Sequence, residues 1–219
     1  MRLSLTCCIG VDNAIQFKVV LASGKYITAN EHRYSDLFWA LRGGGGGTYG
    51  VVVSVTYQTH DIFPLTSILL QVNLTTAESA LNVTTEFLKL HPGLSDASWG
   101  GYLFFNLPVL QAIYIAPDVS VAQVNATLNP FLDKAKAITG SSTNVVYIVG
   151  PAPSFYDWYL SLFNKTGQVG GSGELISRLL SRDLVQQQPD KAAKIMLNVA
   201  ASNGLEFKYA HFYLLNIAF

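Results

Sequence analysis

Apolar and polar positions in the first sixty residues predict two paired strands, a short helix and a third strand. Residues 23–25 (SGK) suit a hairpin turn, and residues 36–42 (DLFWALR) have helical spacing with Ser35 or Asp36 as the N-cap. Five consecutive glycines, Gly43–Gly47, are expected to end that helix. The three strands are expected at residues 14–21, 26–29 and 51–59.

Beyond Pro64, strands and amphipathic helices alternate. Pro92-Gly93 is expected to end the first of these helices, and Pro130 to kink or split the second. Strand pairs broken by helices predict an α+β class with an antiparallel sheet covered by helices. The change of pattern predicts two domains, residues 1–63 and residues 64–219. The strands are expected at residues 67–74, 98–106, 109–116, 145–149, 176–180 and 207–217, and the helices at residues 76–90, 120–137, 154–163 and 190–201.

Composition narrows the classes of function. Half of the 219 residues are hydrophobic and 13% are charged, which excludes a disordered chain. Fourteen basic and fourteen acidic residues cancel, so the charge favours neither a nucleic-acid groove nor an anionic membrane surface. No apolar run approaches the roughly 18 to 20 residues of a membrane span. Two adjacent cysteines and four scattered histidines do not predict a metal site.

Four Asn-x-Thr sequons point to a secreted glycoprotein, because such sequons are acceptors for N-glycosylation. The composition alone would give about two sequons, so coincidence is the alternative explanation. Residues 1–10 lack the long apolar segment and the cleavage site of a signal peptide, and we therefore expect the natural N-terminus to lie upstream. The sequons begin at Asn73, Asn82, Asn125 and Asn164.

The glycine run formally matches G-x-G-x-x-G through Gly45, Gly47 and Gly50. A dinucleotide-binding fingerprint follows a strand and opens a helix, whereas this loop follows a helix and opens a strand. That order argues against a nicotinamide dehydrogenase, and no Lys-Ser/Thr pair supports a P-loop. Glycines without Cβ atoms allow a close approach either by another backbone segment or by a cofactor. The residues alone leave both readings open.

The segment around this loop resembles a known family. Asp12-Asn13 before I-x-F-x-V-V-L-A-S-G-K, followed by S-D-L-F-W-A-L-R-G-G-G-G-G-T-Y-G-V-V-V-S-V-T, is similar to the end of the flavin domain of berberine-bridge-enzyme-like oxidases. These belong to the vanillyl-alcohol-oxidase-type, or PCMH-type, FAD-binding superfamily. The resemblance is dense over residues 11–60. It is looser over residues 64–219, chiefly through residues 167–173 and 174–182.

The resemblance implies that residues 1–63 are the C-terminal remnant of a PCMH-type FAD-binding domain and residues 64–219 a substrate-binding α+β domain. Trp39 and Leu41 are expected in the core, and Arg42 either contacts a phosphate or is a solvated cation at the helix end. The family's covalent flavin attachment and its Asn-Tyr motif have no counterpart here, and Cys7 and Cys8 are not given the attachment role. The implied cofactor-binding residues are Asp12, Asn13, Gly46, Gly47, Gly50, Val51 and Val52.

The implied activity is oxidation of a small organic or sugar-like substrate by hydride transfer to flavin N5, with O2 or another acceptor reoxidising the flavin. Tyr102, Phe104 and Glu174 are candidate substrate residues, and Tyr102, Tyr114, Tyr156 and Glu174 are candidate bases, none of them singled out. Tyr102 and Phe104 share one strand face, which either lines a pocket or belongs to the core. The alternatives are a secreted α+β binding module without cofactor and an incomplete, catalytically inactive chain.

Overall fold

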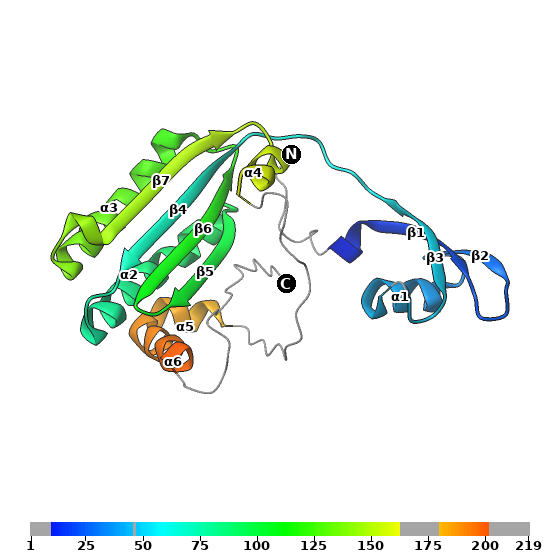
Figure 1. Cartoon of the computed structure of the whole chain (residues 1–219), viewed down its shortest axis with the longest axis horizontal. Coiled ribbons are helices and arrows are strands. Elements are labelled where there is room, and N and C mark those ends of the chain that lie inside the picture. The colour runs from blue at the N-terminus through cyan, green and yellow to red at the C-terminus, as the bar shows by residue number, and fades with distance from the viewer. Residues whose placement is uncertain (1–9, 46, 163–179, 202–219) are drawn as a thin grey trace. The chain divides into compact units, whose positions relative to one another are not determined.

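The computed structural model describes residues 10–45, 47–162 and 180–201, which form two compact units (Figure 1). Among these residues, unit 1 ends at Asp61 and unit 2 begins at Ile62. The assignment of the units to a FAD-binding domain and a substrate domain stays a prediction. No helix in the described ranges is long and apolar enough to cross a membrane.

Unit 1 is a small antiparallel sheet with one helix against it. The strands lie in the order β2-β1-β3, with the central strand β1 paired to both neighbours. Phe17 and Val19 of β1 pack with Phe38 and Leu41 of the helix α1 in a separate small core. The elements of unit 1 are η2 (Gly10–Asn13), β1 (Ala14–Val20), β2 (Tyr26–Asn30), α1 (Ser35–Gly44) and β3 (Val51–Tyr57).

The short helix α1 differs from the expectation at both ends. Neither Ser35 nor Asp36 is its N-cap: Tyr34 holds that position in the left-handed conformation, without a side-chain cap. The helix continues two residues into the glycine run, to Gly44. The prediction of Trp39 as a core residue was wrong, because its side chain is 78% exposed, whereas Leu41 is buried as expected.

Unit 2 is one four-stranded sheet with helices packed on it, which confirms the predicted α+β class. Its strands lie in the order β5-β6-β4-β7, and all neighbouring strands are antiparallel. Helices α2 and α3 cover one face of this sheet, with α5 and α6 beside α2 (Figure 1). The elements are β4 (Leu65–Asn73), α2 (Ala77–Asp96), β5 (Gly100–Asn106), β6 (Val109–Pro117), α3 (Val121–Thr139), η3 (Ser142–Asn144), β7 (Val145–Ala152), α4 (Phe155–Leu162), α5 (Arg182–Gln187) and α6 (Pro189–Ala201).

Pro92 does not end its helix as expected, and Pro130 does not split the helix that contains it. Pro92 lies inside α2, which continues to Asp96, and Pro130 lies inside α3. A proline removes one backbone donor from a helix, but packing beyond it compensates for the loss. Buried Leu94 follows Pro92, and buried Phe131 follows Pro130.

Side-chain caps fix where the two long helices begin. Thr76 accepts from the Ser79 N–H at 3.0 Å while the Ser79 hydroxyl accepts from the Thr76 N–H at 2.9 Å. Ser120 and Gln123 make the equivalent reciprocal pair before α3. Helix α5 was not expected from the sequence. The expected loop at 167–173 and the expected strands at 176–180 and 207–217 lie wholly or almost wholly outside the described residues.

Candidate functional site

The four-stranded sheet of unit 2 has a second face, which lies opposite the helices. Successive strand residues point to opposite faces, so the residues between the core positions point away from α2 and α3. The strand registers place them side by side. We call this the outer sheet face and define it by Ser67, Leu69 and Gln71 of β4, Tyr102, Phe104 and Asn106 of β5, Gln111, Ile113 and Ile115 of β6, and Val146 and Ile148 of β7.

A stacked aromatic pair marks one edge of the outer sheet face. The rings of Tyr102 and Phe104 lie 5.9 Å apart at an interplanar angle of 23°, and both side chains are half-buried. Across the strand pair, Gln111 of β6 stands opposite Phe104. Leu103 and Phe105 of the same strand take the positions that face the helices.

Tyr114, one of the candidate bases, lies on the other side of the sheet. Its hydroxyl is 3.0 Å from Nε2 of His91, inside the core. Burial raises the pKa of the Tyr114 hydroxyl far above its ordinary value and lowers the pKa of His91 to about 4, so the pair is neutral at pH about 7. Tyr114 is therefore a structural residue and is not placed to act on the outer sheet face. Tyr156 is 66% exposed on α4, and Glu174 lies outside the described residues.

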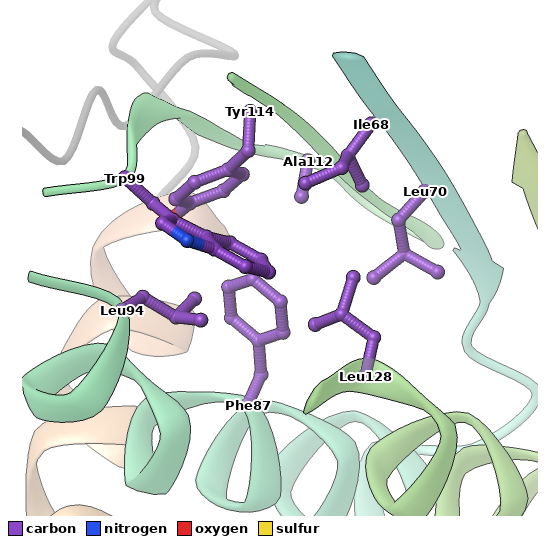
Figure 2. A pocket seen from close by; sticks show the side chains of 8 residues that line it. All are labelled: Ile68, Leu70, Phe87, Leu94, Trp99, Ala112, Tyr114 and Leu128. Atoms are coloured by element: carbon purple, nitrogen blue, oxygen red, sulfur yellow. The ribbon is translucent and has the colours of Figure 1, made fainter. Parts of the chain in front are cut away.

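A cavity of about 10 Å³ lies in the core beside Tyr114. Figure 2 shows the side chains of both layers pointing toward it, with Phe87 from α2 and Leu128 from α3 facing the sheet. Such a volume holds about one water molecule, and its lining is almost wholly apolar. We therefore interpret it as a packing gap and not as a substrate pocket. Its walls are Ile68, Leu70, Phe87, Leu94, Trp99, Ala112, Tyr114 and Leu128.

Two groups of the expected cofactor residues, Asp12-Asn13 and Val51-Val52, lie at opposite ends of one strand pair. Strand β1 runs antiparallel to β3, with Ala14 opposite Tyr57 and Val20 opposite Val51. Asp12 and Asn13, just before β1, are therefore about 20 Å from the start of β3 at the usual rise per strand residue. The described part of unit 1 does not bring the two groups together.

Each residue of the Asp12-Asn13 pair is held by a partner within unit 1. The Asp12 carboxylate accepts from Arg42 Nη2 at 3.2 Å, and Oδ1 of Asn13 lies 2.8 Å from Nε2 of His60. The Arg42 guanidinium also lies over the Phe38 ring, 5.3 Å from its centre. Arg42 thus neutralises a carboxylate in this structure.

The glycine loop has one position where packing forbids a side chain. A Cβ on Gly50 would lie 2.7 Å from both Val19 Cγ1 and the Val20 carbonyl oxygen, so Gly50 is required by the approach of β1. A Cβ on Gly47 would meet open space. Val51 is 69% exposed, and Val52 packs on the small core. Gly46 lies outside the described residues.

These observations test whether the described residues fit FAD. Gly47 leaves open space beside the exposed start of β3, which suits a cofactor's approach. The requirement for glycine at position 50, however, is explained by strand packing, and Arg42, a cation next to the glycine run, is paired with Asp12. The described residues therefore do not assemble a complete FAD site. They also contain no group of three or more His, Cys, Asp or Glu that could hold a metal ion.

A polar groove that was not predicted from the sequence lies on the helical side of unit 2. It is an open groove of about 400 Å³ between α2 and α3. Glu86 accepts from Lys134 at 2.6 Å and from Lys89, and these two hydrogen bonds lower the pKa of Glu86. The i,i+3 spacing of Glu86 and Lys89 was the available signal, but Lys134 comes from another helix. The expected glycosylation residue Asn82 also lines this groove.

Known proteins show what the chain is related to. No family model matches it. An uncharacterized FAD-linked oxidoreductase of Arthroderma benhamiae is 37% identical over 214 residues, covering 90% of this chain and 35% of the relative. The VAO-type flavoprotein MtVAO615 of Myceliophthora thermophila C1 is 27% identical, with a TM-score of 0.67 over 90% of this chain and 36% of that protein. The chain belongs to the FAD-linked oxidoreductases of the VAO and berberine-bridge-enzyme-like family.

A second FAD-linked oxidoreductase of Arthroderma benhamiae agrees with this assignment, at 30% identity over 86% of this chain and 34% of the relative. The chain spans about a third of the length of the relatives it matches. The family prediction made from the residues around the glycine run is thereby confirmed. The roles of individual residues stay predictions.

Proposed function

We propose that this chain is part of an FAD-dependent oxidoreductase that oxidises a neutral small organic or sugar-like substrate. When bound, FAD supplies the hydride acceptor, and O2 or another acceptor completes the turnover. The observation that carries the proposal is the 37% identity to a FAD-linked oxidoreductase over 90% of the chain. FAD binding by this chain itself is not part of the proposal, because its described residues do not complete such a site.

Within that activity, we assign substrate binding to the outer sheet face. The stacked rings of Tyr102 and Phe104 provide a flat apolar surface, on which a sugar ring or an aromatic ring packs. Amide side chains such as Gln111 and Gln71 add neutral hydrogen-bonding groups. The face as defined above contains no charged residue, which supports a neutral substrate because a buried unpaired charge would be costly.

Tyr102 is the one titratable side chain among the residues that define this face. We therefore propose it, in preference to Tyr114, as the residue that holds or moves a proton of the substrate. A phenol hydroxyl can both donate and accept a hydrogen bond. We propose that the Tyr102 hydroxyl orients a hydroxyl group of the substrate through a hydrogen bond.

A chimera tests the proposed function. This chain replaces the matching segment of the 37%-identical Arthroderma relative, and anaerobic flavin bleaching is followed while sugars, alcohols and amines are added. We expect a yellow chimera whose flavin is reduced by a neutral substrate and less readily when Tyr102→Phe is introduced. The unaltered relative is the control. A flavin-loaded chimera that no neutral substrate reduces, beside a parent that is reduced, would refute the assignment.

A cofactor-free binding module is the second candidate function. The observation that favours it is the separation of the expected cofactor residues along β1 and β3. In that case the outer sheet face binds its ligand without flavin. Binding of a neutral saccharide or aromatic alcohol to the isolated chain, unaffected by added FAD, would support this candidate against the first.

A further inference from the structure

We propose that Asn82 carries an N-linked glycan, seated over the groove between α2 and α3. The inference rests on extracellular localisation, which we propose from the four sequons, and it is independent of the FAD-linked activity. Its basis is the environment of two residues, Asn82 and Thr84, which are the first and third positions of one sequon.

Thr84 carries a hydroxyl that the folded protein does not use. Its side chain is 0% exposed on the inner side of α2, and its Oγ1 has no hydrogen-bond partner within the described structure. A buried hydroxyl without a partner destabilises the folded state, and each such group calls for an explanation. Valine has nearly the same shape and would fill the same space without the unmet hydrogen bond.

The next residue of α2, Thr85, also has a buried hydroxyl without a partner among the described residues, but two other threonines on helices of this chain satisfy theirs. Thr127, the third position of the Asn125 sequon, donates to the Gln123 carbonyl at 3.0 Å, and Thr139 donates to the Ala135 carbonyl at 2.8 Å. The hydroxyl of Thr127 therefore has a role in the fold, whereas that of Thr84 has none. N-glycosylation requires a hydroxyl at the third position of the sequon. That requirement explains a threonine where the core favours valine.

The side chain of Asn82 is accessible for glycosylation. It is exposed on the solvent side of α2 and lines the open groove of about 400 Å³. The groove also contains Glu86, bridged to Lys134 from α3, so sugar hydroxyls would find both donors and acceptors there. Because Asn82 lies on the helical side of the sheet, its glycan would leave the outer sheet face clear.

The other two sequons in the described residues are less suitable. Asn125 is half-buried, and its Oδ1 accepts from the Tyr147 hydroxyl at 2.9 Å. Asn73 is half-buried at the end of β4, where it pairs with Val109. By strand alternation its side chain lies on the same side as the outer sheet face, so a glycan there would approach the proposed substrate surface. Asn164 lies outside the described residues.

The test expresses the full chain with an appended signal peptide in a secreting yeast. Intact mass before and after N-glycosidase treatment, with glycopeptide mapping, identifies the occupied residues. The variants are Asn82→Gln, Thr84→Val and, as the matched control, Thr84→Ser, which keeps both the sequon and a hydroxyl. We expect wild type and Thr84→Ser to carry the Asn82 glycan, and Asn82→Gln and Thr84→Val each to lose that one glycan.

The possible outcomes distinguish a failure of this inference from a failure of the secretion and glycoprotein proposals. An unmodified Asn82 beside an occupied Asn73, Asn125 or Asn164 overturns the inference and leaves secretion standing. A secreted chain without any glycan overturns both the inference and the glycoprotein proposal, and neither result bears on the FAD-linked activity. Asn82→Gln alters a solvent-exposed residue, so the result from this variant stands even if the Thr84→Val variant folds poorly.

Discussion

Gly101 is the position where one added methyl group should damage the fold most clearly. It stands opposite Tyr114 in the β5–β6 register, on the core side of the sheet. A Cβ there would clash with the Ile113 carbonyl oxygen and lie 2.7 Å from Cγ of Tyr114. Unstrained carbon contacts are about 3.5–4.0 Å, so β5 would have to move by more than about 1 Å. That shift would disturb the strand ladder and the Tyr114–His91 hydrogen bond.

The neighbouring residue Gly100 provides a matched control. A Cβ on Gly100 meets nothing within 4 Å, and its φ is not in the left-handed region. Gly100→Ala should be neutral or stabilise by up to about 1 kcal/mol, because it restricts the unfolded chain. Gly101→Ala should destabilise by about 3 kcal/mol, the upper range for overpacking. The two single-methyl changes, one residue apart, should therefore differ by about 3–4 kcal/mol.

Urea unfolding followed by circular dichroism measures this difference. With a slope of about 2 kcal/mol per M, the midpoint of Gly101→Ala should lie about 1.5 M below that of wild type. A similar slope in all three proteins would show that they expose a similar surface on unfolding and that the shift in midpoint reports stability. If Gly101→Ala unfolded within about 0.5 kcal/mol of Gly100→Ala, the account of β5 packing against Tyr114 would be refuted.

Three further predictions concern unit 2. Burial lowers the pKa of His91 to about 4, against about 6.5 unfolded, so the unfolded state binds the proton first. Stability should fall by about 3 kcal/mol from pH about 6.5 down to about 4, and His91→Gln should abolish that dependence in urea titrations. Thr84→Val should raise the stability of unglycosylated protein by about 1 kcal/mol relative to Thr84→Ser, and a lower melting temperature would contradict this. In the chimera, Phe104→Ala should raise KM about three- to tenfold with little change in kcat, and an unchanged KM would remove Phe104 from the substrate surface.

The regular elements could be predicted where hydrophobic periodicity was strong. The order of strands and helices through residue 162 follows from alternation in the strands and apolar stripes in α2 and α3. Pro92 was misleading because a local rule about proline competes with tertiary packing. Buried residues on the far side of this proline hold the helix together, and those contacts are not visible in a single sequence.

The candidate site was harder to predict for a physical reason. In the run Tyr102-Leu103-Phe104-Phe105 both strand faces are apolar, so a period of two does not show which face meets the helices. In the helix α1, two neighbouring aromatic residues were both candidates for the core. Trp39 was expected there, although Phe38 is the ring that packs in it. Arg42, the partner of Asp12, and Lys134, one of the two partners of Glu86, are distant from them in sequence.

Flavin binding tests the central claim most directly. The isolated chain and the chimera with the Arthroderma relative are purified with excess FAD, desalted and compared by visible absorption. We predict that the chimera retains about one flavin per chain and the isolated chain almost none, because the described residues hold only separated parts of the cofactor surface. Stoichiometric flavin on the isolated chain would contradict the incomplete site, and a colourless chimera beside a yellow parent would contradict the assigned place of this chain in a FAD-linked oxidoreductase.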